Sequence, residues 1–163
     1  MLVDTDFDSV VAALADGGVE FLIVGGLAAT VHGSARLTHG IDVLYRRTPE
    51  NLVRLAAALA PHQPYLRGAP PGLPFSLDAD TLRRGLNFTL TTRLGPIDLL
   101  REMLGAGTYD DLADRSLQVE LFGRSCRVVD LHTLIEAKRA AGRPKDLEVL
   151  AELEALLEQR GDD

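Results

Sequence analysis

Apolar residues recur along the first part of this chain with two spacings, which predict helices alternating with strands. Residues 5–16 carry apolar side chains on one face of a helix, and Gly17 and Gly18 end it. Residues 19–24 are β-branched and aromatic and lack polar alternation after Glu20, which is typical of a buried strand. A short helix is expected after the two glycines that follow, with its end at Gly33.

The middle of the chain begins with a second apolar segment, residues 40–45, which predicts another strand. Thr48 is a helix-capping residue type, and a proline and an acid follow it, so a helix is expected over residues 49–59. Residues 61–74 contain five prolines and two glycines and are expected to form a loop.

The second half of the chain predicts two hairpins followed by two helices. The expected strands are 86–92 and 96–100 in the first hairpin and 117–122 and 124–129 in the second, and the expected helices are 131–141 and 144–159. Asp130 can cap the first helix, while Gly142 and Pro144 separate the two. The strands at 19–24 and 40–45 are expected to be neighbours.

This order of elements indicates an α/β fold in a single domain, residues 1–163, with a central mixed β-sheet flanked by helices. The core would span about residues 5–130, and a C-terminal helix pair would span about residues 131–159. A length of 163 residues agrees with one domain.

Composition removes several classes of protein. With 17 basic and 24 acidic residues the net charge is −7, which argues against extended DNA binding but leaves a local basic site open. The single cysteine excludes an intrachain disulfide framework and a Cys-rich metal site. The longest apolar stretch, from Phe21 to Val31, is too short to span a bilayer, and no basic segment followed by an apolar run opens the chain. We therefore expect a cytoplasmic protein without a membrane partner.

Two carboxylates stand in unusual positions. Asp42 and Asp98 are each the single acid of an apolar strand segment, where an acid costs free energy unless it is paired, capped or bound to a metal. Taken alone, each is equally explained as a residue that faces solvent at a strand edge. Together they suggest carboxylates that converge on a divalent ion from two strands.

Two other segments have both a functional and a structural explanation. Gly25 and Gly26 lie between a strand and a helix, where they can cradle phosphate or can simply allow close packing. Lys138, Arg143 and Lys145 flank a helix junction, where they can meet a triphosphate or can form an ordinary solvated turn. The four histidines show no metal-ligand spacing, and Cys126 is expected to be a small buried residue.

The ordered motifs of the chain resemble the signature of the nucleotidyltransferase superfamily with the polymerase-beta-like fold. They also resemble, more narrowly, the small bacterial AbiEii-toxin-like family of toxin–antitoxin and phage-abortive systems. The motifs are Ile23–Gly26, His32–Val43, Gly95–Leu100, and the two C-terminal stretches Leu134–Lys138 and Ala141–Leu147. The resemblance covers residues 19 to about 155.

The resemblance implies a role for each motif residue. The catalytic residues would be Asp42, Asp98 and Lys138, and the two aspartates would hold Mg²⁺. The nucleotide-binding residues would be Gly25, Gly26, Ser34, Arg36, Thr38, Arg143 and Lys145. Gly25, Asp42 and Asp98 should then face one cleft.

The chain departs from the family pattern at Gly40, which stands where the first acid of the Asp-x-Asp pair is expected. Two metal ions about 3.5–4 Å apart need bridging carboxylates, and glycine supplies no ligand. His39 points to the opposite face of a strand and does not replace it. The loss predicts weakened Mg²⁺ binding and weak or absent transfer.

Three functions follow from these observations. The first is Mg²⁺-dependent transfer from a nucleoside triphosphate to an RNA such as a tRNA end, to a protein or to a small molecule. The second is binding of a nucleotide or an antitoxin-like protein without catalysis, which Gly40 favours. The third, a structural module without a ligand, explains Gly40 but not the other motif positions.

Overall fold

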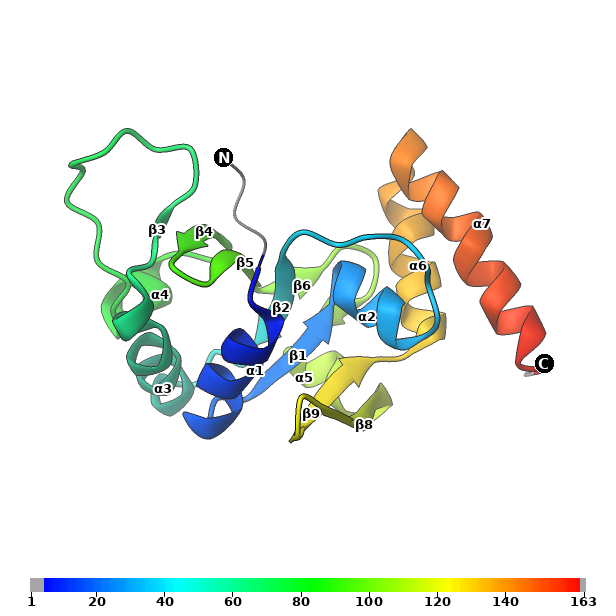
Figure 1. Cartoon of the computed structure of the whole chain (residues 1–163), viewed down its shortest axis with the longest axis horizontal. Helices are drawn as coiled ribbons and strands as arrows, with labels where there is room; N and C mark the ends of the chain where they lie inside the picture. The colour runs from blue at the N-terminus through cyan, green and yellow to red at the C-terminus, as the bar shows by residue number, and fades with distance from the viewer. Residues whose placement is uncertain (1–4, 162–163) are drawn as a thin grey trace.

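The computed structural model describes residues 5–161 and is built around one mixed sheet of seven strands, in the order β3-β4-β5-β2-β1-β9-β8 (Figure 1). Its strands are β1 Phe21–Val24, β2 Ile41–Tyr45, β3 Tyr65–Leu66, β4 Phe88–Thr92, β5 Gly95–Leu100, β8 Ser116–Leu121 and β9 Arg124–Val129. A separate two-stranded sheet pairs β6 Glu102–Met103 with β7 Gly107–Thr108. The expected α/β class with a central mixed sheet is confirmed.

Helices flank this sheet. They are α1 Phe7–Asp16, α2 Gly25–Val31, α3 Pro49–Leu59, α4 Ala79–Arg84, α5 Tyr109–Leu112, α6 Leu131–Ala141 and α7 Pro144–Gln159, with short 3₁₀ turns at Ala60–His62 and Ala113–Arg115. In Figure 1, α6 and α7 lie together at one end of the molecule, and the loop between β3 and α4 lies at the other. None of the helices among residues 5–161 is long and apolar enough to cross a membrane.

The centre of the sheet brings two sequence-distant segments together. Strand β2 runs antiparallel to β1, with Val24 opposite Asp42, so the expected neighbouring of these strands is confirmed. On its other side β2 runs parallel to β5, with Asp42 opposite Asp98. The two candidate carboxylates therefore occupy the same register position on adjacent strands.

Burial explains which face the carboxylates take. Ile97 and Leu99 of β5 are fully buried, and Asp98 between them is only partly buried, because successive side chains of a strand point to opposite faces. In β2, Ile41 and Val43 are fully buried on either side of Asp42. At these positions the apolar side chains therefore lie on one face of the sheet and the two carboxylates on the other, although Leu44 is also buried on the carboxylate face.

The C-terminal helices have the expected bounds because their ends are locally encoded. The Asp130 side chain accepts a hydrogen bond from the Thr133 N–H at the start of α6. Gly142 ends α6 in the left-handed conformation, which glycine adopts without a steric cost. Pro144 then opens α7, whose Leu153 is fully buried.

Several elements differ from the expectation. Strand β1 begins at Phe21 rather than at residue 19, and α2 begins at Gly25 itself rather than after Gly26. The loop expected over 61–74 contains the short strand β3, which pairs with β4. Elements α4, α5, β6 and β7 were not expected, because each is too short to show a periodic pattern and depends on tertiary contacts.

Candidate functional site

Asp42 and Asp98 form a carboxylate pair on one face of the sheet. They lie opposite one another in the parallel β2–β5 register. Burial, and then the negative charge of Asp98, raise the pKa of Asp42 from 3.8 to about 6. The charges of Lys138 and Arg67 oppose this shift without cancelling it. The pair therefore concentrates negative charge that a cation can relieve.

Arg67 already supplies such a cation to one member of the pair. The residue follows β3 directly, and its guanidinium Nη2 lies 2.7 Å from Asp98 Oδ1 and 2.6 Å from the Leu90 carbonyl oxygen. Sequence reasoning missed this residue, because one arginine in a proline-rich loop carries no periodic or motif signal. Only the pairing of β3 with β4 brings it to Asp98.

The two glycines at the start of α2 make room for side chains of this same chain. Gly25 has a φ of +65°, and a Cβ there would overlap the carboxylate of Asp42. A Cβ at Gly26 would lie 2.5 Å from Thr38 Oγ1. Thr38 in turn donates a hydrogen bond to the Gly40 carbonyl oxygen. Close internal packing therefore explains both glycines, and they bring the start of α2 against Asp42.

Two adjoining cavities lie beside Gly25, at the start of α2, and together we call them the cleft. The first, of about 170 Å³, is lined by Gly25, Asp42, Lys138 and Arg143 among others. The second, of about 140 Å³, has a lining that includes Gly25, Gly26, Ser34, Arg36, Thr38 and Lys138. Gly25, Leu134 and Lys138 line both, so α6 forms the shared wall.

The basic side chains of the cleft are held by a buried acid. Asp146 is 1% exposed, and its carboxylate accepts hydrogen bonds from Arg143 Nε at 2.6 Å and from Lys138 Nζ at 3.3 Å. These contacts, above all the one from Arg143, lower the pKa of Asp146 to about 2. Asp146 therefore fixes Lys138 at the cleft wall while using part of its charge.

The remaining motif residues have different placements. Ser34 donates to Glu152 Oε1 at 2.7 Å, and Arg36 forms an ion pair with the same carboxylate at 3.5 Å. Both line the cleft, so the fold brings them to the place that the motif predicts. Lys145 is exposed on α7 and is not among the residues that line either cavity. The fold does not bring it to the candidate site.

The oxygen ligands near the cleft suit the Mg²⁺ that the resemblance implies only in part. Asp42 and Asp98 are hard oxygen ligands on one face, and Mg²⁺ often takes one or two carboxylates together with phosphate oxygens and water. Among residues 5–161, no group of three or more His, Cys, Asp or Glu side chains is arranged to hold a metal ion. The residues therefore fit one ion bound together with a nucleotide, and they do not fit a two-metal centre.

The histidine and cysteine side chains agree with the structural role expected for them. His32 is 5% exposed and lies 2.8 Å from the Val129 carbonyl oxygen through Nε2. Arg160 can only donate, so His32 Nδ1, 3.0 Å from it, accepts and Nε2 carries the proton. The Cys126 thiol is buried, and burial raises its pKa.

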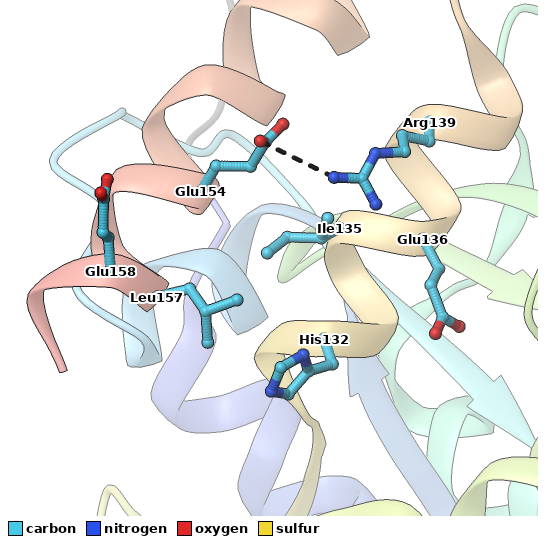
Figure 2. A pocket seen from close by; sticks show the side chains of 7 residues that line it. All are labelled: His132, Ile135, Glu136, Arg139, Glu154, Leu157 and Glu158. Carbon is cyan, nitrogen blue, oxygen red and sulfur yellow. Dashed lines mark ion pairs between the residues drawn. The ribbon is translucent and has the colours of Figure 1, made fainter. Parts of the chain in front are cut away.

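A further cavity, of about 460 Å³, opens between α6 and α7 (Figure 2). Figure 2 shows Arg139 of α6 reaching toward Glu154 of α7, with an ion-pair distance of 3.7 Å, above the apolar Ile135 and Leu157. None of the predicted catalytic or nucleotide-binding residues lines this cavity, although Ile135 and Glu136 belong to the Leu134–Lys138 motif. Its lining shares no residue with that of the cleft.

Comparison with known proteins adds no assignment. No protein-family model matches the chain, and no curated protein matches it.

Proposed function

We propose that the chain binds a nucleoside triphosphate in the cleft and is a nucleotidyltransferase-like protein with weak transfer activity. The observation that carries this proposal is the register pairing of Asp42 with Asp98 on one sheet face, next to the Gly25 turn and the α6 wall. Two apolar strands would not place carboxylates side by side for packing alone, because their mutual repulsion and burial cost stability.

The polar groups of the cleft suit the phosphates of a triphosphate. Lys138 lines both cavities and is held at the wall by Asp146, so its ammonium group is positioned before a ligand binds. Arg143 lines one cavity of the cleft and Arg36 lines the other, and each adds charge there. Charge-assisted hydrogen bonds of this kind contribute about 1.5–3 kcal/mol each.

Asp42 and Asp98 would hold a Mg²⁺ ion that enters with the nucleotide, and this ion would neutralise phosphate charge at the reacting end. Gly40 removes a ligand from that set, and Arg67 competes for Asp98. Both features support weak transfer. The acceptor would be an RNA, a protein or a small molecule.

A second function is favoured by the same two features. A chain that retains the cleft but has lost one acid and has paired another with arginine can bind a nucleotide or an antitoxin-like protein without catalysis. Transfer of radiolabelled nucleotide to bulk RNA or protein distinguishes the two functions. If the chain is an enzyme, labelled product should form and should depend on Asp42. If it only binds its ligand, no labelled product should form.

Calorimetric titration of ATP and GTP, with and without Mg²⁺, tests the proposed site. The Lys138→Ala protein should bind roughly tenfold more weakly than the unaltered chain, because one charge-assisted contact is lost. Lys145→Ala is the matched control, since Lys145 does not line the cleft, and it should bind unchanged. Equal affinity in all three proteins, or no binding to any, would remove the cleft from consideration.

A further inference from the structure

A basic pocket lies at the ends of β2 and β5, away from the carboxylate pair. Arg46 and Arg47 follow β2 directly, and Arg101 follows β5. The two strands are parallel, with Leu44 opposite Leu100, so their ends meet at one edge of the sheet. The three arginines, with Thr108 and Asp110, line a cavity of about 210 Å³, which we call the arginine pocket.

The charges of the arginine pocket are not balanced. Arg46 is compensated on both sides, because its Nη1 lies 2.9 Å from Glu20 Oε2 and its Nε lies 3.0 Å from Asp110 Oδ1. Within residues 5–161, neither Arg47 nor Arg101 forms an ion pair with an acid. A chain with a net charge of −7 thus keeps two uncompensated guanidinium groups at one cavity.

Arg47 is held in place by neutral acceptors. Its guanidinium donates to the Tyr45 hydroxyl, to the Leu82 carbonyl oxygen at 3.1 Å and to the Arg83 carbonyl oxygen at 2.9 Å. It also lies 5.5 Å from the centre of the Tyr45 ring. These contacts fix its position without cancelling its charge, so little side-chain entropy remains to be lost when an anion binds.

The pocket also has more donors than acceptors. The Arg46 Nε–H is buried and makes no hydrogen bond, although Asp110 lies beside it. Arg101 also lines the cavity, and its side chain is exposed. Asp110 is the single carboxylate in the lining, and Arg46 already holds it.

We propose that the arginine pocket binds a phosphate group, with Arg47 as the fixed partner and Arg101 as the adjustable one. Arginine suits this role because its planar fork matches two phosphate oxygens. The tyrosine rings of the lining, Tyr45 and Tyr109, are 1% and 8% exposed, so they offer no face on which a base can stack. The recognised chemistry is therefore the phosphate of a small ester or of a polynucleotide backbone. This inference does not depend on the proposed function of the cleft.

The test is a titration of the ¹⁵N-labelled full chain followed by NMR, with three probes used separately. The probes are inorganic phosphate, methyl phosphate and a single-stranded oligoribonucleotide without a terminal phosphate. At least one probe should shift the Arg46 Nε–H signal and the Thr108 amide signal. A response to the first two probes assigns a small phosphate ester, whereas tighter binding of the oligoribonucleotide assigns a backbone phosphate.

The deciding variant is Arg101→Gln, because the Arg101 side chain is exposed and forms no ion pair among the described residues. It should bind the responding probe roughly tenfold more weakly. Arg54→Gln, an exposed arginine of α3 that does not line the pocket, is the control and should bind as the unaltered chain does. The proposal would be overturned if none of the three probes shifted the Arg46 Nε–H and Thr108 amide signals, or if Arg101→Gln left the affinity unchanged.

Discussion

At the scale of single residues, the surroundings of Asp42 disfavour the charged form of its carboxyl group. Burial and the neighbouring Asp98 raise its pKa to about 6, against 3.8 for an unperturbed aspartate. The folded chain therefore binds a proton at Asp42 more tightly than the unfolded chain does. Stability contributed by this proton is present at low pH and is lost as the pH rises from about 4 through 6.

The Asp42→Asn protein should lack this loss, because asparagine carries no charge. We expect its free energy of unfolding at pH 8 to exceed that of the unaltered chain by up to about 3 kcal/mol, with the difference vanishing near pH 4. Urea unfolding of both proteins across this pH range measures the difference. A constant difference across the range would show that Asp42 is not ionised at a cost.

Arg67 determines how much of the carboxylate pair is free for a cation. Because its guanidinium lies 2.7 Å from Asp98, removing it should leave Asp98 available to a metal ion. We expect Arg67→Ala to bind Mn²⁺, used as a spectroscopic substitute for Mg²⁺, several-fold more tightly in the presence of ATP. Electron paramagnetic resonance measures the bound fraction. Arg93→Ala, an exposed arginine on the β4–β5 turn, is the control, and an equal change in both variants would argue against the account.

At the scale of elements, the β1–α2 junction is built around the contact between Gly25 and Asp42. A side chain at position 25 meets both a φ of +65° and the carboxylate of Asp42. We expect Gly25→Ala to reduce the free energy of unfolding by more than about 2 kcal/mol. Gly68→Ala should cost only about 1 kcal/mol, because its φ of +81° is equally unfavourable but nothing lies within 4 Å. Denaturant unfolding of the two variants separates strain from overlap.

The start of β2 offers a gain-of-function test at Gly40. This residue is partly buried, and its Cβ would lie 3.2 Å from the Pro96 carbonyl oxygen and 3.3 Å from Pro96 Cβ, so an added side chain requires Pro96 to shift by a few tenths of an ångström. It lies in the bend just before β2, two residues before Asp42, and a side chain there would lie beside Pro96, two residues before Asp98 on β5. Gly40→Asp should therefore tighten Mg²⁺-dependent ATP binding, as measured by calorimetry. Gly68→Asp adds the same charge in a distant loop, and an equal effect there would contradict a local role.

Local signals were enough to predict many elements and the neighbouring of two strands, but not every contact between elements. The bounds of α3, α6 and α7 follow from caps and prolines such as Thr48 and Pro144. The neighbouring strands and the placement of Asp42 and Asp98 followed from apolar segments and motif order. The ion pair of Arg67 with Asp98 could not be predicted, because 31 residues separate them and a loop makes the connection.

At the scale of the whole molecule, the acidic chain distributes its positive charge unevenly. In the cleft, Lys138 and Arg143 share the single carboxylate of Asp146, and Arg36 pairs with Glu152. In the arginine pocket, Arg46 pairs with Glu20 and Asp110, whereas Arg47 and Arg101 form no ion pair among the described residues. A triphosphate therefore has two candidate binding places. One is the cleft, whose cations are partly neutralised by acids, and the other is the arginine pocket, where two guanidinium groups form no ion pair among the described residues.

The most direct measurement is a crystal structure of the chain with Mg²⁺ and a non-hydrolysable ATP analogue. We expect the triphosphate between the Gly25 turn and Lys138, with its reacting end at Asp42, which lines the cleft, beside Asp98 on the neighbouring strand. A triphosphate bound in the arginine pocket or between α6 and α7, with the cleft unchanged, would contradict it.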